Sequence, residues 1–599
     1  ITKVIAGIDR ADMITLPNHI TQHASTNLEG CSCHGSVHAP NPDGVSSGGL
    51  ACYGCHGELE DDMEWDAGGV APYGHAVGTS SRNGDTAAYP DYGTDSKSNV
   101  YCLSCHMDHT FNSDKGLNLR TSVDAAATAT RTDHAEGTAN GVCVTCHSID
   151  VGTVTYNVSG ADYQNAAHDY DVNDASLVGY DGTSAFRPNC TKCHTDPVGL
   201  DGRQDGTYKV APHFSDDESR LAKALGATIT GTSSTEENLC FACHDSASTG
   251  NDGYGVQAMG SAARNVEYYF TTTDAGYSTY RHNVVGYSDV HVTDENQTDI
   301  NTNGEHIECE DCHNPHTLGD NTLNSTNHST GTNAIGSASP IAGVTGIEVA
   351  FGVEWATPGS GDYSEVTADK EHEICFKCHS GANTNLTSWN AAWTNVALEF
   401  NPANDSFHPV TAALPAVDLG ANNGSSQLPN ANRLGGNWTA GRGQTMYCSD
   451  CHGDSAASPR AQGPHGSAAT YMLKGPNSVW PGSNGQFYLG GTNTGLFCLN
   501  CHPNLNSATS GNSNGVHTRG SHRNSSDGIC TACHITVPHG GKVSRLIVDR
   551  DTTPAPYLGY NAAIRSFRKD PAGTYNNAAN YCYASCQHTG IQNYEDWND

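Results

Sequence analysis

Hydrophobic residues along this chain occur singly or in short runs, between long stretches rich in glycine, serine, threonine, asparagine and aspartate. The abundance of glycine and asparagine disfavours long helices, because both residues are poor helix formers. Strand patterns are few, and the segment GVTGIEVAFGVEW at 343–355 gives only a weak one. No apolar run reaches the roughly 18 residues of a membrane-spanning helix. The pattern therefore predicts a mostly irregular fold of coil, short helices and few short strands, with no membrane span.

Composition raises the question of what such a chain folds around. Apolar residues make up only 36% of the 599 residues, a share that in an ordinary chain of this length suggests disorder or a poor core. Large apolar groups bonded to the chain at intervals would replace the missing core. They would also offset the conformational entropy that folding must overcome.

The cysteines identify such a group. Residues 306–316 read HIECEDCHNPH, and a C-x-x-C pair alone could be half of a zinc site. A histidine directly after the second cysteine is instead the attachment signature of c-type haem: both thiols bond to the haem vinyl groups and the histidine is the proximal iron ligand. The motif occurs ten times. Disulfide frameworks place no demand on the residue after a cysteine, so we expect ten covalent haems from these copies.

The ten copies are distributed along nearly the whole chain, so we interpret residues 1–599 as one extended cytochrome around closely packed haems. Polar stretches near 320–340 and 411–440 are candidate soft joints. Short helical turns are expected after several motifs. The attachment cysteines are Cys52, Cys55, Cys102, Cys105, Cys143, Cys146, Cys190, Cys193, Cys240, Cys243, Cys309, Cys312, Cys375, Cys378, Cys448, Cys451, Cys498, Cys501, Cys530 and Cys533, and the proximal histidines are His56, His106, His147, His194, His244, His313, His379, His452, His502 and His534.

Two cysteine pairs depart from the pattern. Cys31 and Cys33 have one residue between them, yet His34 still follows directly, so we expect an eleventh haem there, with Cys33 the surer attachment point. The alternative is that this site is silent and the chain carries ten haems. Cys582 and Cys586 have three residues between them, and Gln587 displaces His588 from the proximal position. We expect a short-loop disulfide at this last pair.

The histidines exceed what proximal ligation needs. Eleven of the 31 follow a cysteine pair, which leaves 20 and predicts that most haems are six-coordinate with two histidine ligands. His316 follows His313 too closely to reach the opposite face of the same haem, so it is expected to cap a neighbouring one. The candidate distal ligands are His23, His38, His75, His109, His134, His168, His213, His306, His316, His408, His465, His522 and His539, and a reserve that includes spectators comprises His19, His282, His291, His328, His372, His517 and His588.

Other sequence features bear on calcium binding, on the partners and on the cellular location of the chain. Asp299–Glu310 satisfies a calcium-loop pattern, but its end overlaps a haem motif and no flanking helices are evident, so calcium is a minor alternative. A net charge of −35 repels nucleic acid and anionic membranes and suits cationic partners or metal ions. Haem attachment of this kind and the expected disulfide indicate a secreted chain whose signal peptide has been removed.

The C-terminal third carries the most specific resemblance. It contains YCSDCHG…GPHGSAATYMLKGP at 447–476, LFCLNCHP at 496–503 and SHRNSSDGICTACHITVPHGGKVSRLI at 521–547. These segments resemble the multihaem c-type cytochromes of metal-reducing bacteria that carry electrons to the cell surface. Some relatives of that class polymerise into extracellular filaments, the cytochrome nanowires.

The resemblance and the histidine surplus together favour an electron carrier over an enzyme, because two histidine ligands leave an iron no open position for substrate. We expect an extracellular or cell-surface subunit of a head-to-tail homopolymer, with other c-type cytochromes as donors and metal oxides or other external acceptors. A monomeric periplasmic or surface shuttle is the alternative. A multihaem reductase is a further rival, and the irregular site at Cys31 would be the place to seek its open iron. His19 or His23, or else His588, is expected to cap a haem of the adjoining subunit.

Overall fold

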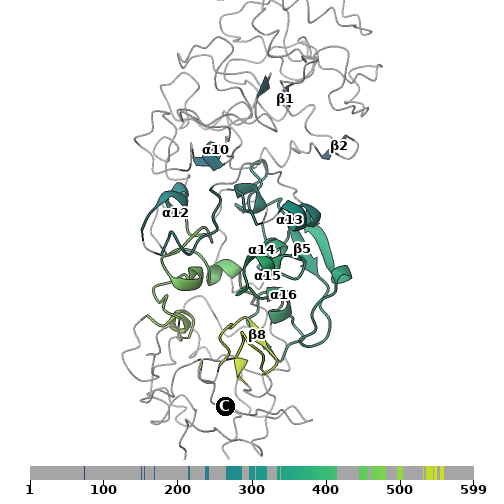
Figure 1. Ribbon diagram of the computed structural model, residues 1–599, viewed down its shortest axis with the longest axis vertical. Coiled ribbons are helices and arrows are strands. Elements are labelled where there is room, and N and C mark those ends of the chain that lie inside the picture. The colour runs from purple at the N-terminus through teal and green to yellow at the C-terminus, as the bar shows by residue number, and fades with distance from the viewer. Residues whose placement is uncertain are drawn as a thin grey trace, which may run out of the picture.

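Figure 1 shows a computed structural model of the chain. It describes residues 265–319, 333–413, 444–480, 495–502 and 531–558, with gaps at 275, 286–295, 304, 337–338, 456–460, 532–533, 544–545 and 549–552. Short pieces at 73–74, 150–151, 154–155, 168, 214–215, 237–241 and 244 are also described. The predicted soft joints near 320–340 and 411–440 lie largely outside these residues.

Coil dominates the described residues, with short helices and two-stranded antiparallel sheets between the coil segments, which confirms the predicted irregular fold. Among these residues no helix is long and apolar enough to cross a membrane. The α-helices are α10 (Glu237–Phe241), α12 (Glu267–Thr271), α13 (Gln297–Asn303), α14 (Glu371–His379), α15 (Leu386–Trp389) and α16 (Val396–Glu399); the 3-10 helices are η6 (Cys309–Asp311), η8 (Ser360–Asp362), η9 (Cys448–Asp450), η10 (Thr470–Met472) and η11 (Phe497–Asn500); and the strands are β1 (Tyr73–Gly74), β2 (Asp150–Val151), β3 (Val154–Thr155), β4 (Phe214–Ser215), β5 (Thr345–Val349), β6 (Tyr363–Thr367), β7 (Ser406–Phe407) and β8 (Gly540–Gly541).

The longest described helix packs against the longest hairpin. Strand β5 pairs with β6 from Thr345↔Thr367 to Val349↔Tyr363, so the weak strand pattern in the sequence does form a strand. Helix α14 lies across this hairpin. At Gly346 an added Cβ would come within 2.9 Å of the Glu373 Cβ atom, so the glycine allows the helix its close approach.

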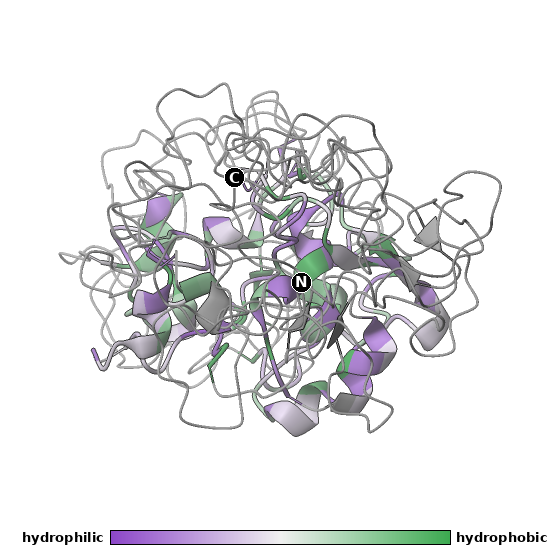
Figure 2. Cartoon of the chain, turned by 90° about the horizontal axis from the view of Figure 1, so that it is seen from above, coloured by the Kyte–Doolittle hydropathy of each residue, from purple (hydrophilic) through white to green (hydrophobic). Residues whose placement is uncertain are grey.

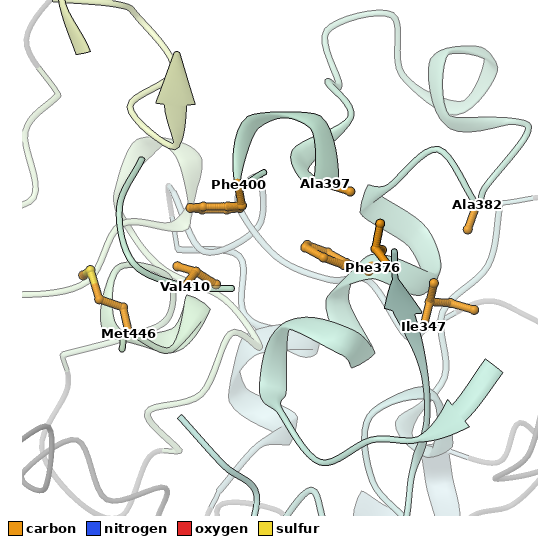
Figure 3. Close-up of a cluster of buried hydrophobic side chains, with 8 residues drawn as sticks. Ile347, Phe376, Ala382, Ala397, Phe400, Val410 and Met446 are labelled. Atoms are coloured by element: carbon orange, nitrogen blue, oxygen red, sulfur yellow. The ribbon is translucent and has the colours of Figure 1, made fainter. Parts of the chain in front are cut away.

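A small apolar cluster fixes α14 in place. Phe376 of α14 and Ile347 of β5 are 1% and 2% exposed, and they pack with Ala397 of α16 and with Phe400 (Figure 3). Burying a side chain of this size stabilises a fold by about 1.5–3 kcal/mol. A separate cluster forms around Tyr269 and Phe270. Figure 2 shows apolar residues in short pieces among hydrophilic ones, which matches the low apolar content.

Candidate haem sites

Each C-x-x-C-H motif that the structure describes in full forms a helical turn. The backbone N–H of His313 donates to the Cys309 carbonyl at 2.9 Å, and that of His452 donates to the Cys448 carbonyl at 3.0 Å. Side chains three and four positions apart lie on the same face of a helical turn. The turn therefore directs both cysteines and the histidine to one side. Sequence reasoning expected such turns after the motifs, whereas the structure has them within the motifs.

Acidic residues in and before the motifs cap these turns. The Asp311 Oδ2 atom accepts from the Glu308 N–H at 2.9 Å, and the Asp450 Oδ2 atom accepts from the Tyr447 N–H at 2.8 Å. Glu373 of α14 accepts from two backbone N–H groups in the same way. A carboxylate at this position satisfies N–H groups that have no partner within the helix and opposes the helix dipole favourably. The intervening residues of the motif thus help to form the turn.

Four motif histidines lie opposite a second histidine that is distant in sequence. Two metal–imidazole bonds of about 2 Å on either side of one ion place the two ring centres about 6 Å apart. All four pairs in the structure have this separation. The ring centroids are 6.4 Å apart for His168 and His244, 5.9 Å for His313 and His465, 6.0 Å for His282 and His379, and 6.2 Å for His452 and His539.

Hydrogen bonds orient these imidazoles. A carbonyl oxygen cannot donate a proton, so a histidine whose Nδ1 bonds to a carbonyl carries its proton there and keeps Nε2 as an acceptor. This is the arrangement of a metal-ligating histidine. The Nδ1 atom lies 3.0 Å from the Pro315 carbonyl in His168, 2.7 Å from that of Pro464 in His282, 2.7 Å from that of Pro340 in His313 and 2.9 Å from that of Tyr471 in His452, and the Pro538 carbonyl accepts from His408.

Burial keeps the paired histidines neutral. It lowers the pKa of His168 to about 4, with a further contribution from His244, and it lowers the pKa of His465 to about 3, with His313 contributing. Burial is likewise the main cause that lowers the pKa of His379 to about 3 and that of His452 to about 4. Neutral imidazole is the form that binds a metal.

Cysteine thiols of consecutive motifs lie close to one another. Burial raises the pKa of the Cys312 thiol to about 12, and the neighbouring Cys375 contributes to this rise. A hydrogen bond with the Cys375 thiol, together with burial, raises the pKa of Cys448 well above its usual range. Burial and the nearby Cys501 raise the pKa of Cys451. Consecutive motifs therefore lie side by side.

The imidazole pairs follow the same order. Burial is the main cause of the lowered pKa in each case, and the next pair contributes: His313 to the shift of His168, His282 to that of His465, and His452 and His539 to that of His379. A fifth association continues the series: burial lowers the pKa of His408 to about 4, and the nearby His502 and His539 lower it further. The line therefore runs through the motifs that begin at Cys240, Cys309, Cys375, Cys448 and Cys498.

Short antiparallel bridges join the distal histidines two at a time. The His282 N–H donates to the His465 carbonyl at 3.1 Å, beside the bridge between Arg281 and Gly466. The His408 N–H donates to the His539 carbonyl at 2.8 Å, beside the β7–β8 pair. In each bridge one histidine belongs to a Pro–His dipeptide, and its proline carbonyl accepts from the other histidine ring. We call this arrangement the histidine bridge.

The residues present fit haem. The paired rings have the separation that two axial ligands need, and the Nδ1 bonds of His282, His313 and His452 leave Nε2 as the acceptor. The buried Nδ1 atom of His465 has no hydrogen-bond partner among the described residues. Cys309, Cys312, Cys375, Cys448 and Cys451 form no disulfide. The histidine pairs would hold the iron and the cysteines would hold the macrocycle edge.

Sequence reasoning selected most, but not all, of the paired histidines. His168, His465 and His539 were candidates and lie opposite motif histidines, and His408 lies near His502. His282 was only a reserve, and its local sequence carries no signal that would have promoted it.

Four further histidines are described. One of them, the motif histidine His534, is half-buried and lies in an antiparallel bridge with Ile547. His372, another reserve, packs against Phe376 with ring centroids 5.1 Å apart, and its Nδ1 atom lies 3.4 Å from Asn333 Nδ2. His306 and His316 are half-buried and belong to none of the four pairs. The distal role predicted for these two therefore stays a prediction.

Many predicted site residues lie outside the described part of the chain, and their roles stay predictions. They are Cys31, Cys33, His34, Cys52, Cys55, His56, Cys102, Cys105, His106, Cys143, Cys146, His147, Cys190, Cys193, His194, Cys243, Cys530, Cys533, Cys582 and Cys586, with the candidate ligands His19, His23, His38, His75, His109, His134, His213, His291, His328, His517, His522 and His588.

The segment with the calcium-loop pattern is partly helical. Helix α13 covers Gln297–Asn303, so the first ligand positions of the pattern lie on a helix instead of in a loop. Within the described residues no group of three or more His, Cys, Asp or Glu side chains is arranged to hold an ion.

Comparison with protein-family models, with curated proteins and with solved structures finds no match for this chain.

Proposed function

We propose that this chain is a multihaem c-type cytochrome that carries electrons along a line of haems with two histidine ligands each. The observation that carries the proposal is the series of opposed imidazoles, each pair about 6 Å apart and each adjoining the next. An enzyme would need an open ligand position, and an opposed imidazole leaves none. Haem, when bound, supplies an iron that takes up and releases one electron.

The protein residues have three roles in this proposal. The motif cysteines fix the position of each macrocycle, and the two imidazoles fix its orientation. The carbonyl groups of Pro464, Pro340 and Tyr471 hold the ligating tautomer. Tyr471 adopts a positive φ of 61°, an uncommon conformation for a non-glycine residue, at the point where its carbonyl meets His452.

The histidine bridge supports two candidates outside the described residues. Tyr73 pairs with Ser215 and Gly74 with Phe214, just as Ser406 pairs with Gly541 and Phe407 with Gly540. In the sequence His75 follows β1 as His408 follows β7, and Pro212–His213 precedes β4 as Pro538–His539 precedes β8. We infer that His75 and His213 serve two neighbouring haems in the same way.

The intact mass of the mature chain tests the proposal. We expect eleven covalent haems, or ten if Cys31 and Cys33 are silent. A count of twelve would show that Cys582 and Cys586 hold haem, and would disprove the disulfide expected there. Nine or fewer would refute the reading of the C-x-x-C-H motifs.

We further propose that the protein acts outside the cytoplasm, at the cell surface or beyond it, as a subunit of a head-to-tail filament. Its donors would be other c-type cytochromes, and its acceptors extracellular metal oxides. The net charge of −35 supports cationic or mineral partners over nucleic acid. A contact between unlike surfaces that does not close into a ring produces an open polymer.

Replacing His19 and His23 together with alanine tests the filament. If one of them caps a haem of the adjoining subunit, electron micrographs of the double variant will show single particles in place of filaments, while its mass shows a full haem complement. Replacing His372 with glutamine is the control, because this histidine packs within its own chain, and filaments should persist. Normal filaments from the double variant would exclude an N-terminal donor.

A further inference from the structure

Glu399 is a buried carboxylate directly behind one of the paired histidines. Its side chain is 0% exposed, and the His539 Nδ1 atom lies 2.6 Å from its Oε2 atom. The Tyr557 hydroxyl donates to the other oxygen, Oε1, at 2.9 Å. Both carboxylate oxygens are therefore engaged, one by an imidazole and one by a phenol.

This acceptor differs in kind from those of the other oriented histidines. His168, His282, His313, His408 and His452 each bond through Nδ1 to a neutral backbone carbonyl. A carboxylate is a stronger acceptor than a carbonyl, and a hydrogen bond to it makes the imidazole a more electron-rich ligand.

The local fold holds the carboxylate in this place. Helix α16 ends at Glu399 and is capped at its start by the Asn395 side chain, which accepts from the Ala397 N–H at 3.1 Å. The Asn404 amide donates to the Glu399 carbonyl at 2.8 Å. At Gly540, next to His539, an added Cβ would collide with the Glu399 carbonyl oxygen. Only glycine allows the two segments this approach.

An aromatic ring packs against His539. The Phe400 and His539 ring centroids are 4.7 Å apart, and Phe400 is 6% exposed. Burial and the adjacent Glu399 charge raise the pKa of Tyr557, so its hydroxyl remains a donor. Charge interactions are stronger in such a water-poor setting.

We propose that Glu399 is a positioning residue that lowers the reduction potential of the haem attached to Cys448 and Cys451. This rests on the proposed function, because it requires haem between His452 and His539. Haem held by these residues would accept one electron from a neighbouring haem or an external donor, and its iron would change from ferric to ferrous with no bond to the protein broken. The carboxylate favours the ferric form, which has one more positive charge.

The variant Glu399→Gln tests this in the full-length holoprotein, titrated against redox mediators with optical and EPR detection. Glutamine keeps the size and an acceptor oxygen but removes the charge. We expect one haem's share of the titration to move to higher potential. The equilibrium constant for reduction should rise tenfold or more, which corresponds to about 59 mV for a one-electron couple. One low-spin EPR signal should shift, and the haem count should stay the same.

Two further variants separate this effect from a general change of charge. Glu348→Gln removes the same charge at an exposed position on β5 and should leave the titration unchanged. Tyr557→Phe removes the competing donor and so concentrates the carboxylate charge on His539. It should lower the reduction potential of the same haem. If the Glu399→Gln protein lacks its full haem complement, the redox titration of Tyr557→Phe decides whether Glu399 has the proposed role.

The outcomes distinguish the role of Glu399 from the proposed function of the chain. Suppose that the Glu399→Gln protein carries all its haems and its reduction potentials equal those of the original protein. This result would overturn the role of Glu399 alone, and so would a higher reduction potential of this haem in Tyr557→Phe. A protein that carries no covalent haem would overturn the proposed function.

Discussion

Replacing His465 with glycine is expected to convert one haem from low-spin to high-spin while every haem stays covalently attached. His465 lies opposite His313, with ring centroids 5.9 Å apart and planes inclined by 20°. Its removal leaves the iron with His313 as its protein ligand and an opening the size of an imidazole. The EPR and optical spectra of the oxidised holoprotein should show a high-spin fraction equal to one haem's share.

Added imidazole provides a sensitive control for this variant. Free imidazole fits the opening and should restore the low-spin spectrum, which a general disturbance of the fold would not allow. His372→Gln is the matched substitution, because His372 contacts Phe376 and Asn333 and lies opposite no motif histidine among the described residues. A fully low-spin His465→Gly protein, or a high-spin His372→Gln protein, would contradict the ligand pairs that we infer.

Replacing Lys377 with methionine is expected to destabilise the protein by about 3–5 kcal/mol, the usual cost of leaving one partner of a buried ion pair uncompensated. Lys377 and Asp311 are 3% and 6% exposed, and the Lys377 ammonium donates to the Asp311 carbonyl oxygen at 2.7 Å. Asp311 belongs to the motif at Cys309 and Lys377 to the motif at Cys375. The bond therefore joins two neighbouring motifs that are proposed to hold haem, and urea unfolding of the oxidised holoprotein should show its loss.

The same helix offers a matched control at its other end. Lys370 pairs with Asp369 at 2.8 Å and with the buried Glu373 carboxylate at 3.1 Å, but its own side chain is 34% exposed. Solvent screens ion pairs of a partly exposed ammonium, so Lys370→Met should lower the free energy of unfolding by less than Lys377→Met does. Equal effects of the two substitutions would show that the contact between Lys377 and Asp311 does not stabilise the junction.

Much of the chemistry is local, and the sequence determined it. Cysteines at positions one and four and a histidine at position five lie on one face of a single helical turn. The motifs at Cys309 and Cys448 therefore predict which thiols and which proximal histidine would hold a haem, without knowledge of the fold. The low apolar content and the many glycines likewise predicted the irregular architecture that the described residues have.

Only the tertiary structure decided which histidine faces which motif. His282 meets His379 and bonds to Pro464, 182 residues away, while His539 meets His452 and bonds to Glu399, 140 residues away. Neither a helical nor a strand period runs through these segments, so nothing in the local sequence specifies the partner. Short bridges, buried carboxylates and close approaches at glycines fix these pairings, and such contacts form only when distant segments of an irregular chain come together.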